Sequence, residues 1–365
     1  MRIRVTEGEE GSRFLRADAI EVLEASPHRA VPPCPYAGPG RCGGCDFQHS
    51  ELAYQRELKA DVVREQFSRL AHLDVDVTVE PLPGDGALAD GLRWRTRVEF
   101  AVDGDGRAGL RKHRSHDVLA VRDCLISDER IVATGVLGRT WKGSSGVDVV
   151  AASDPAAAVL VPLPDGRDRP VIEHVATPGW SADFRVGARG FWQVHPSAAS
   201  TFASHLLADV DPRPGERVLD LYAGVGLFAL AFADRVGPAG SVLAVEGSRS
   251  AVADGALNTA GRPYVEWRNG RVDTVLKTVV TNMVSADVVV LDPPRTGAGR
   301  DVCRSVIALS PRLIGYVACD PAALARDTAY LGAAGYHLTS LRAFDAFPMT
   351  HHVECIAVFA PDRRR

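Results

Sequence analysis

The sequence predicts an α/β protein whose C-terminal part is a doubly wound, mostly parallel sheet. The first observation is the run RVLDLYAGVGLFALAF at 217–232, which reads as a short apolar strand, a glycine turn and a helix. A continuous apolar strand is typical of a sheet covered on both faces. Strand, glycine turn and helix N-terminus together form the ligand-binding corner of such folds. Two further apolar strands, 241–246 and 286–292, each end in an acid.

The glycine corner also narrows the class of ligand. Gly224 and Gly226 form a GxG turn without the third glycine that brings a helix against a pyrophosphate. Glu246 ends the next strand, where a carboxylate can accept hydrogen bonds from ribose hydroxyls. S-adenosylmethionine, a nucleoside without phosphates, agrees with both observations. A nicotinamide cofactor is the alternative.

Bulk properties limit the remaining classes. With 365 residues the chain is long enough for two or three domains. Its formal net charge of −4 excludes general polyanion binding, so any nucleic-acid contact must come from local patches. No apolar run approaches the roughly 18–20 residues that cross a bilayer, and no basic-then-apolar leader opens the chain. We expect a cytoplasmic protein without membrane contact.

The cysteine pattern indicates a metal centre. The seven cysteines are an odd number without a secretion signal, which disfavours disulfides. Cys42 and Cys45 form a CGGC motif, with Cys34 upstream and Cys124 much later. Four thiolates suit either an iron–sulfur cluster or zinc, and the spacing does not separate the two. Cys303 and Cys355 are better explained as buried core residues.

Three parts follow from the patterns along the chain. Residues 1–26 contain two or three strands, too few for independent stability. Residues 27–186 form a small β-rich central domain with the cysteine site; within it, 51–73 has helical period and is expected to pack on the catalytic domain. Residues 187–365 form the ligand-binding domain. Short strand-like runs at 130–180 are hard to place.

A hairpin at 92–126 concentrates positive charge. Arg93, Arg95 and Arg97 alternate along its first strand and therefore share a face, and three further cations follow the turn, namely Arg111, Lys112 and Arg114. The face is either simply solvated or contacts phosphates. The second interpretation is favoured because these cations adjoin Cys124 in a chain that is otherwise acidic.

The candidate reactive groups lie at strand ends. Asp292 precedes a stiff Pro-Pro turn, and Cys319 ends the next strand before a helix, where helix amides are expected to lower its thiol pKa. Glu354 heads the last apolar strand and is a candidate general base. Gln193, in the run FWQVHP, either belongs to an aromatic hinge or lies at the lip of the ligand site. His351 and His352 are interpreted as loop or substrate-side residues.

These motifs resemble those of the bacterial RNA uracil-5-methyltransferases, class I methyltransferases that form 5-methyluridine. The resemblance runs from about residue 30 to the end, through the cysteines, FWQVHP, DLYAGVGLFALAFA, VLDPPRTGAG, VACDPAALARD and FPMTHHVEC. It implies a Rossmann-like methyltransferase domain beside a β-rich central domain. Residues 1–26 then correspond to the second half of a small β-barrel RNA-binding module.

The resemblance also implies the roles of individual residues. Position by position, Cys319 corresponds to the nucleophile and Glu354 to the proton acceptor. The contacts to S-adenosylmethionine would come from Gln193, Tyr222, Gly224, Gly226, Glu246 and Asp292. A four-iron four-sulfur cluster, with zinc as the alternative, would be held by Cys34, Cys42, Cys45 and Cys124.

Uracil chemistry suggests a mechanism for these residues. The Cys319 thiolate adds to C6, C5 takes the methyl group, and Glu354 removes the C5 proton from a flipped-out uridine. Single-stranded readout favours RNA over DNA as the partner. The cluster cysteines favour 23S ribosomal RNA by analogy; 5-methyluridine formation in tRNA, or a non-catalytic RNA-binding or assembly factor with a vestigial cofactor pocket, is the alternative. We expect a monomer.

Overall fold

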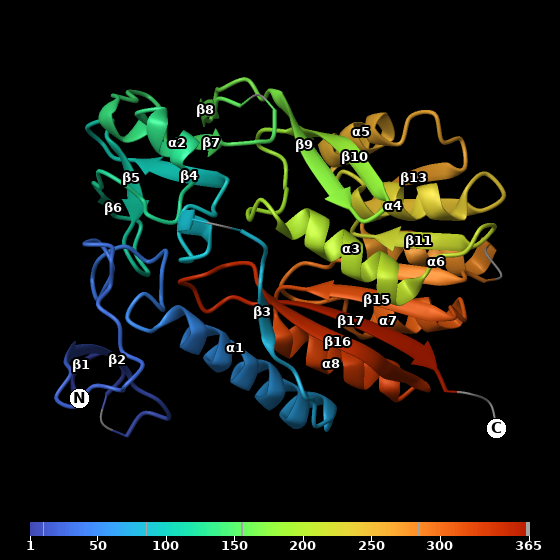
Figure 1. Ribbon diagram of the computed structural model, residues 1–365, viewed down its shortest axis with the longest axis horizontal. Helices are drawn as coiled ribbons and strands as arrows, with labels where there is room; N and C mark the ends of the chain where they lie inside the picture. Colours follow the sequence, from blue (N-terminus) through green and yellow to red (C-terminus); the bar gives the residue numbers. More distant parts are fainter. Residues whose placement is uncertain (10, 85, 155, 283–284, 363–365) are drawn as a thin grey trace.

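The computed structural model describes residues 1–365 apart from 10, 85, 155, 283–284 and 363–365. Its largest feature is an eight-stranded sheet with the strand order β13-β12-β11-β14-β15-β17-β16-β3 (Figure 1). The strands are β3 (Val79–Pro81), β11 (Arg217–Leu221), β12 (Ser241–Glu246), β13 (Val265–Asn269), β14 (Val288–Leu291), β15 (Leu313–Ala318), β16 (Tyr336–Asp345) and β17 (Glu354–Pro361).

The order of the strands creates a switch point between β11 and β14. From β11 the chain steps outward to β12 and β13, and then returns to β14 on the other side of β11. All these contacts are parallel, as are those of β14 with β15, whereas β17 runs antiparallel to β15 and β16. Ligands of open α/β sheets bind at the carboxyl ends of strands beside such a reversal. The predicted doubly wound α/β fold is confirmed.

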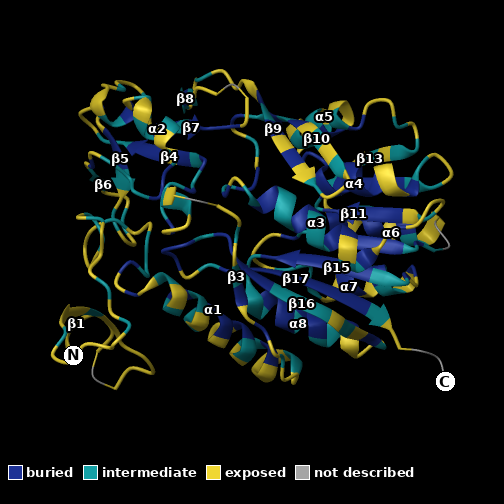
Figure 2. Cartoon of the chain, viewed as in Figure 1, coloured by how far each residue is buried: buried dark blue, intermediate teal, exposed yellow. Residues whose placement is uncertain are grey.

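Helices cover both faces of this sheet, and Figure 2 shows the strands as a buried layer between them. Apolar residues of β11 alternate between two cores: Val218 joins one and Leu219 the other. This is the period-two pattern of a strand buried on both faces. The helices of this part are α3 (Ala198–Val210), α4 (Leu227–Val236), α5 (Arg249–Asn258), α6 (Val272–Asn282), α7 (Gly299–Ala308) and α8 (Pro321–Gly332).

A second, five-stranded sheet forms the central part of the chain, with the order β6-β5-β4-β7-β8 and its own apolar core. The hairpin β9–β10 packs against α3 and α5 (Figure 1), and the pair β1–β2 at the N-terminus is mostly exposed. The elements are β1 (Arg2–Glu7), β2 (Arg16–Glu21), β4 (Arg97–Val102), β5 (Ala108–Arg111), β6 (Val118–Leu119), α2 (Glu129–Ala133), β7 (Gly146–Val150), β8 (Val159–Leu163), β9 (Pro170–Thr177) and β10 (Trp180–Gly187), with 3₁₀ turns at Gly86–Leu88 and Val136–Gly138.

The helix predicted at 51–73 is present as α1 (Leu52–Gln66), followed by a π-helical turn at Phe67–Ala71. Its apolar residues Ala60, Val63 and Phe67 enter the same core as α8 and β16. This helix, early in the chain, therefore packs on the sheet built by the C-terminal part (Figure 1). Within the described ranges, no helix combines the length and the apolar character that a membrane crossing needs.

Candidate active site and cysteine site

The glycine corner after β11 is shaped by left-handed backbone. Gly224 and Gly226 have φ of 55° and 92°, a region that glycine adopts without steric cost. The amide of Gly224 donates to Glu246 Oε2 at 2.9 Å. A Cβ on Gly226 would come within 3.0 Å of the Trp267 ring, so a side chain is excluded there. The turn therefore lies close against the end of β12.

The predicted cofactor contacts gather at the carboxyl ends of β11, β12 and β14. Glu246 ends β12, and its other oxygen accepts from the amide of Ser248 at 2.7 Å. Asp292 follows β14 directly, and burial together with the charge of Glu246 raises its pKa to about 7. Tyr222, with φ of 65°, starts the turn between them. These residues thus follow three neighbouring parallel strands at the same end of the sheet.

Gln193 does not follow a strand of this sheet; it lies in the connection between β10 and α3. It precedes α3 and is 8% exposed. The carbonyl of its neighbour Val194 accepts from both the amide and the hydroxyl of Thr96, at 2.8 and 2.9 Å. Among the described residues, the Gln193 side chain makes no hydrogen bond with Tyr222, Glu246 or Asp292. The structure thus buries Gln193 but does not itself join it to them.

A further buried acid, which the sequence analysis did not assign, lies within β11 near Asp292 and Glu246. Asp220, in β11, is 1% exposed, and neither carboxylate oxygen has a hydrogen-bond partner within the described part of the chain. Burial raises its pKa to about 8, and the charges of Asp292 and Glu246 add to this. A buried carboxyl without a partner is costly unless a ligand supplies one. The signal was a single acid inside an otherwise apolar strand.

Cys319 and Glu354 are brought together by strand register. β15 and β17 are antiparallel, and their last pair at this edge is Ala318 with Cys355. Cys319 follows Ala318 and Glu354 precedes Cys355, so both lie one residue beyond this pair at the same end of the sheet. Residues opposite each other on antiparallel strands have side chains on one face, with Cβ atoms about 5 Å apart. The nucleophile and base candidates therefore face the same place beside Asp292.

The thiol of Cys319 is not activated as predicted. We expected helix amides to lower its pKa, but burial and the charges of Glu354 and Asp292 raise it to about 11. The first turn of α8 is already capped by Asp320, whose carboxylate accepts from the amide of Ala323 at 2.7 Å. Burial and Asp292 likewise hold the pKa of Glu354 well above its usual range. The Cys319 thiol is thus protonated at neutral pH, and burial disfavours the charged form of Glu354.

Arg295 opposes the rise in the pKa of Cys319 and Glu354, a role that the sequence analysis did not assign to it. Its positive charge lowers the pKa of both Cys319 and Glu354. The guanidinium lies 3.3 Å from Nε2 of His352, in the connection between β16 and β17. The sequence signal was an arginine at the position after Asp-Pro-Pro where an aromatic side chain would stack on a base.

The raised pKa values predict the pH dependence of the reaction. A thiol must lose its proton to attack, and a carboxylic acid must lose its proton to act as a base. Because the pKa of the Cys319 thiol is about 11 and methyl transfer needs its thiolate, the single-turnover rate of methyl transfer with saturating RNA should rise about tenfold per pH unit from about pH 6 to 9. Arg295→Met should lower the rate at each pH in this range. A rate that reaches its plateau near neutrality would contradict this assignment.

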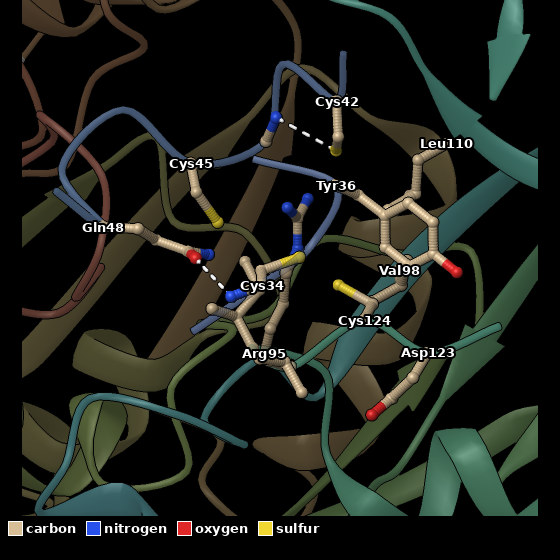
Figure 3. A pocket seen from close by; sticks show the side chains of 13 residues that line it. Cys34, Tyr36, Cys42, Cys45, Gln48, Arg95, Val98, Leu110, Asp123 and Cys124 are labelled. Atoms are coloured by element: carbon tan, nitrogen blue, oxygen red, sulfur yellow. Dashed lines mark hydrogen bonds between the residues drawn. The ribbon is translucent and has the colours of Figure 1, made fainter. Parts of the chain in front are cut away.

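The four predicted metal ligands line one cavity. Cys34, Cys42, Cys45 and Cys124 surround a space of about 40 Å³, and Figure 3 shows their sulfur atoms facing it. The other walls combine apolar side chains, such as Val98, Leu110 and Ile126, with polar ones, among them Arg95 and Asp123. The amide of Cys34 donates to Gln48 Oε1 at 3.1 Å, which holds the CGGC side of the cavity to its upstream cysteine.

Burial makes the thiols of this cavity hard to ionise. Burial and the neighbouring thiols raise the pKa of Cys34, Cys42 and Cys45, that of Cys45 to about 12. Four thiolates in such a place require a positive partner. Among the residues that the structure describes, no three His, Cys, Asp or Glu form a group that could hold a metal ion. Zinc would draw all four sulfurs to about 2.3 Å from one centre, whereas a cluster spaces them further apart.

The arginines at 93, 95 and 97 contact other parts of the protein. The prediction that they form a phosphate-contacting face is therefore wrong. Arg93 forms a two-pronged ion pair with Asp123 at 2.8 and 2.9 Å. Arg97 binds Glu173 at 2.7 Å, with its side chain only 10% exposed. Arg95 lines the cysteine cavity. These arginines are used within the fold, so phosphate contacts are left to the turn that follows.

The fold and the site together define a class I, S-adenosylmethionine-dependent methyltransferase. A family model for tRNA (uracil-5-)-methyltransferases matches residues 266–361. An uncharacterized RNA methyltransferase of Streptomyces avermitilis is 47% identical over 98% of this chain and 89% of its own length. The 23S rRNA (uracil(1939)-C(5))-methyltransferase RlmD of Chromohalobacter salexigens is 33% identical over 100% of this chain and 83% of its own. The chain belongs to the RNA uracil-5-methyltransferase family.

A solved structure agrees with the fold. The Pyrococcus abyssi tRNA (uracil-54, C5)-methyltransferase, in complex with S-adenosyl-L-homocysteine, superposes with a TM-score of 0.69. The match covers 98% of this chain and 93% of that one, at 20% identity. At this identity the likeness concerns the arrangement of the elements.

Proposed function

We propose that this protein methylates C5 of a uridine in 23S rRNA through a transient bond between Cys319 and C6. The observation that supports the proposal is the register of β15 and β17, whose last pair, Ala318 with Cys355, makes Cys319 and Glu354 the next residues at the carboxyl end of β15. The whole-length relative that acts on 23S rRNA favours ribosomal RNA. The family model named for tRNA makes transfer RNA the alternative substrate.

Bound S-adenosylmethionine supplies an electrophilic methyl group at the glycine corner. The residues that would hold it are Gln193, Tyr222, Gly224, Gly226, Glu246 and Asp292. Glu246 is available for ribose hydroxyls, and the unpartnered carboxyl of Asp220 offers a further acceptor toward a ligand amino group. The fit is one of chemistry: the GxG turn lacks the third glycine that brings a helix against a pyrophosphate.

The reaction at the uridine is carried by two side chains of this chain. The Cys319 thiolate forms a bond to C6, and the electron pair of the C5–C6 double bond moves toward O4, which makes C5 nucleophilic. C5 accepts the methyl group, and the electron pair of the broken methyl–sulfur bond would stay on the sulfur of the departing S-adenosylhomocysteine. Glu354 then takes the C5 proton, the C6–S bond breaks, and the double bond returns as the thiolate leaves. Atoms and electrons balance without any redox partner.

The cysteine site would hold a four-iron four-sulfur cluster through Cys34, Cys42, Cys45 and Cys124. Support comes from the shared cavity and from the need for positive charge among buried thiols. Beside it, the exposed cations of the turn 111–114 line a surface hollow with the CGGC loop. We assign RNA phosphate contacts to this turn. Residues 187–365 carry methyl transfer, and the central part holds the cluster and the RNA.

Anaerobically purified protein should be brown and absorb in the visible region of iron–sulfur clusters. Cys45→Ser should lose this absorbance and the bound iron, because one of four ligands is gone. Metal analysis and absorbance check the result. Cys303→Ser, which changes a cysteine outside the cavity, is the matched control. A colourless wild-type protein with one zinc per chain would contradict the cluster.

The experiment that tests the function is nucleoside mass spectrometry with site mapping. Ribosomal and transfer RNA from a strain lacking the protein should be compared with the parent, and purified protein should restore the modification. We expect one 5-methyluridine of 23S rRNA to disappear. Loss from tRNA alone would establish the alternative substrate, and no loss in any RNA would overturn the proposal.

A further inference from the structure

One buried amide joins the central part of the chain to the connection between β16 and β17, residues 346–353, which we call the catalytic loop. Gln55, on α1, is fully buried. Its Nε2 donates to the carbonyls of Phe47 and Ser50 at 3.0 and 2.9 Å, and its Oε1 accepts from the amide of Met349 at 2.9 Å. One side chain thus holds the segment after the CGGC motif and the catalytic loop together.

Lys59 lies one helical turn further along the same face of α1. Its ammonium binds Asp345 Oδ1 at 2.6 Å and the carbonyl of Phe347 at 3.1 Å. The two charged side chains are 0% and 1% exposed. A buried ion pair is a poor source of stability compared with apolar packing, and is best explained where it fixes one arrangement. Here it fixes the first residues of the catalytic loop.

The middle of the catalytic loop is a turn with its own hydrogen bonds, from Thr350 to the carbonyl of Phe347, and with further bonds from outside the loop. Met349 has φ of 67°, in the left-handed region that bulky side chains avoid. Both of its backbone polar groups are bound from outside the loop: the amide by Gln55, and the carbonyl by the amide of Phe47 at 3.0 Å. Gln55 of α1 and Phe47 of the segment before it therefore hold the turn at Met349.

The catalytic loop leads directly into the proposed chemistry. Glu354 is the first residue of β17 and follows the loop without a gap. Within the loop, His352 contacts Arg295, the cation that lowers the pKa of Cys319 and Glu354. A shift of the loop would displace the carboxylate and the guanidinium together.

We propose that Gln55 and Lys59 are positioning residues for Glu354, acting through the catalytic loop. The inference rests on the proposed function. Neither side chain reaches the uridine, so their effect is on geometry. Because a displacement of about 1 Å can cost about a hundredfold in rate, proton removal from C5 is the step that depends on them. Methyl transfer precedes that step.

The test measures proton removal separately from folding. In Gln55→Met and Lys59→Met, ordinary uridine RNA should remain covalently bound to the protein, because the methylated adduct forms but is not resolved. The adduct is counted on denaturing gels, together with kcat, KM for RNA and the melting temperature. Lys59→Met/Asp345→Asn removes the pair without leaving an unpaired buried charge. Glu65→Gln, in the exposed pair with Arg69 on α1, is the matched control.

We expect kcat to fall by about ten- to a hundredfold with KM within about twofold, and adduct to accumulate in all three variants. The double variant should recover melting temperature over Lys59→Met but not kcat. Activity that follows the melting temperature, without adduct, would overturn the inference. Such a result would overturn only the positioning role of Gln55 and Lys59, because wild-type protein would still methylate uridine and still require Cys319. Wild-type protein that methylates no uridine, or needs no Cys319, would instead refute the proposed function.

Discussion

Cys319→Ala should abolish methylation of uridine and leave no covalent protein–RNA complex. Without the sulfur, C6 has no nucleophile and C5 stays too weakly nucleophilic to take a methyl group. We expect the rate to fall by at least about a thousandfold, as when a nucleophile is removed from a unit that acts together. The measurement is transfer of labelled methyl from S-adenosylmethionine to RNA. RNA carrying 5-fluorouridine at the target should trap the wild-type protein, since fluorine cannot leave as a proton does.

The control for this loss is another cysteine of the same part of the chain. Cys303, on α7, is buried in the apolar core. Cys303→Ala should keep methylation within about threefold at a temperature where it is folded, and should still be trapped by 5-fluorouridine RNA. If Cys319→Ala binds S-adenosylmethionine and RNA normally and also methylates at the wild-type rate, the covalent mechanism is wrong.

Glu354→Gln should stop the reaction one step later and accumulate the methylated adduct on ordinary uridine RNA. Glutamine keeps the size of the side chain and can fill the same buried place, but it cannot take the C5 proton. Turnover should fall by about a hundred- to ten-thousandfold, the usual contribution of a general base. Intact mass spectrometry of the protein–RNA complex should give the mass of protein plus RNA plus one methyl group.

Glu266→Gln provides the matched change at a distance. Glu266 pairs with Arg268 on the exposed edge strand β13, and its side chain is 60% exposed. This variant should turn over normally and accumulate no adduct. A Glu354→Gln protein that is folded, binds both substrates, and is slow without accumulating adduct would assign proton removal to another group. Asp292, with its raised pKa, would be the next candidate.

The sequence alone was sufficient for the fold class, because apolar periodicity is a local property. An apolar run such as that of β14 can only be a strand covered on both faces, and GxG after β11 requires left-handed backbone. The strand-end rule of parallel sheets also placed Glu246 and Asp292 at one edge. The grouping of Cys34, Cys42, Cys45 and Cys124 followed from motif spacing and from the resemblance.

Only the tertiary structure decided how these groups behave. The pKa of Cys319 depends on which charges surround it, and strand register brings Glu354 and Asp292 there from distant segments. Arg93 pairs with Asp123 and Arg97 with Glu173, and no local pattern reveals either pair. The hydrogen bonds of Gln55 and Lys59 join residues nearly three hundred positions apart in the sequence. Side-chain electrostatics and buried hydrogen bonds arise from neighbours in space, which the order of residues along the chain does not specify.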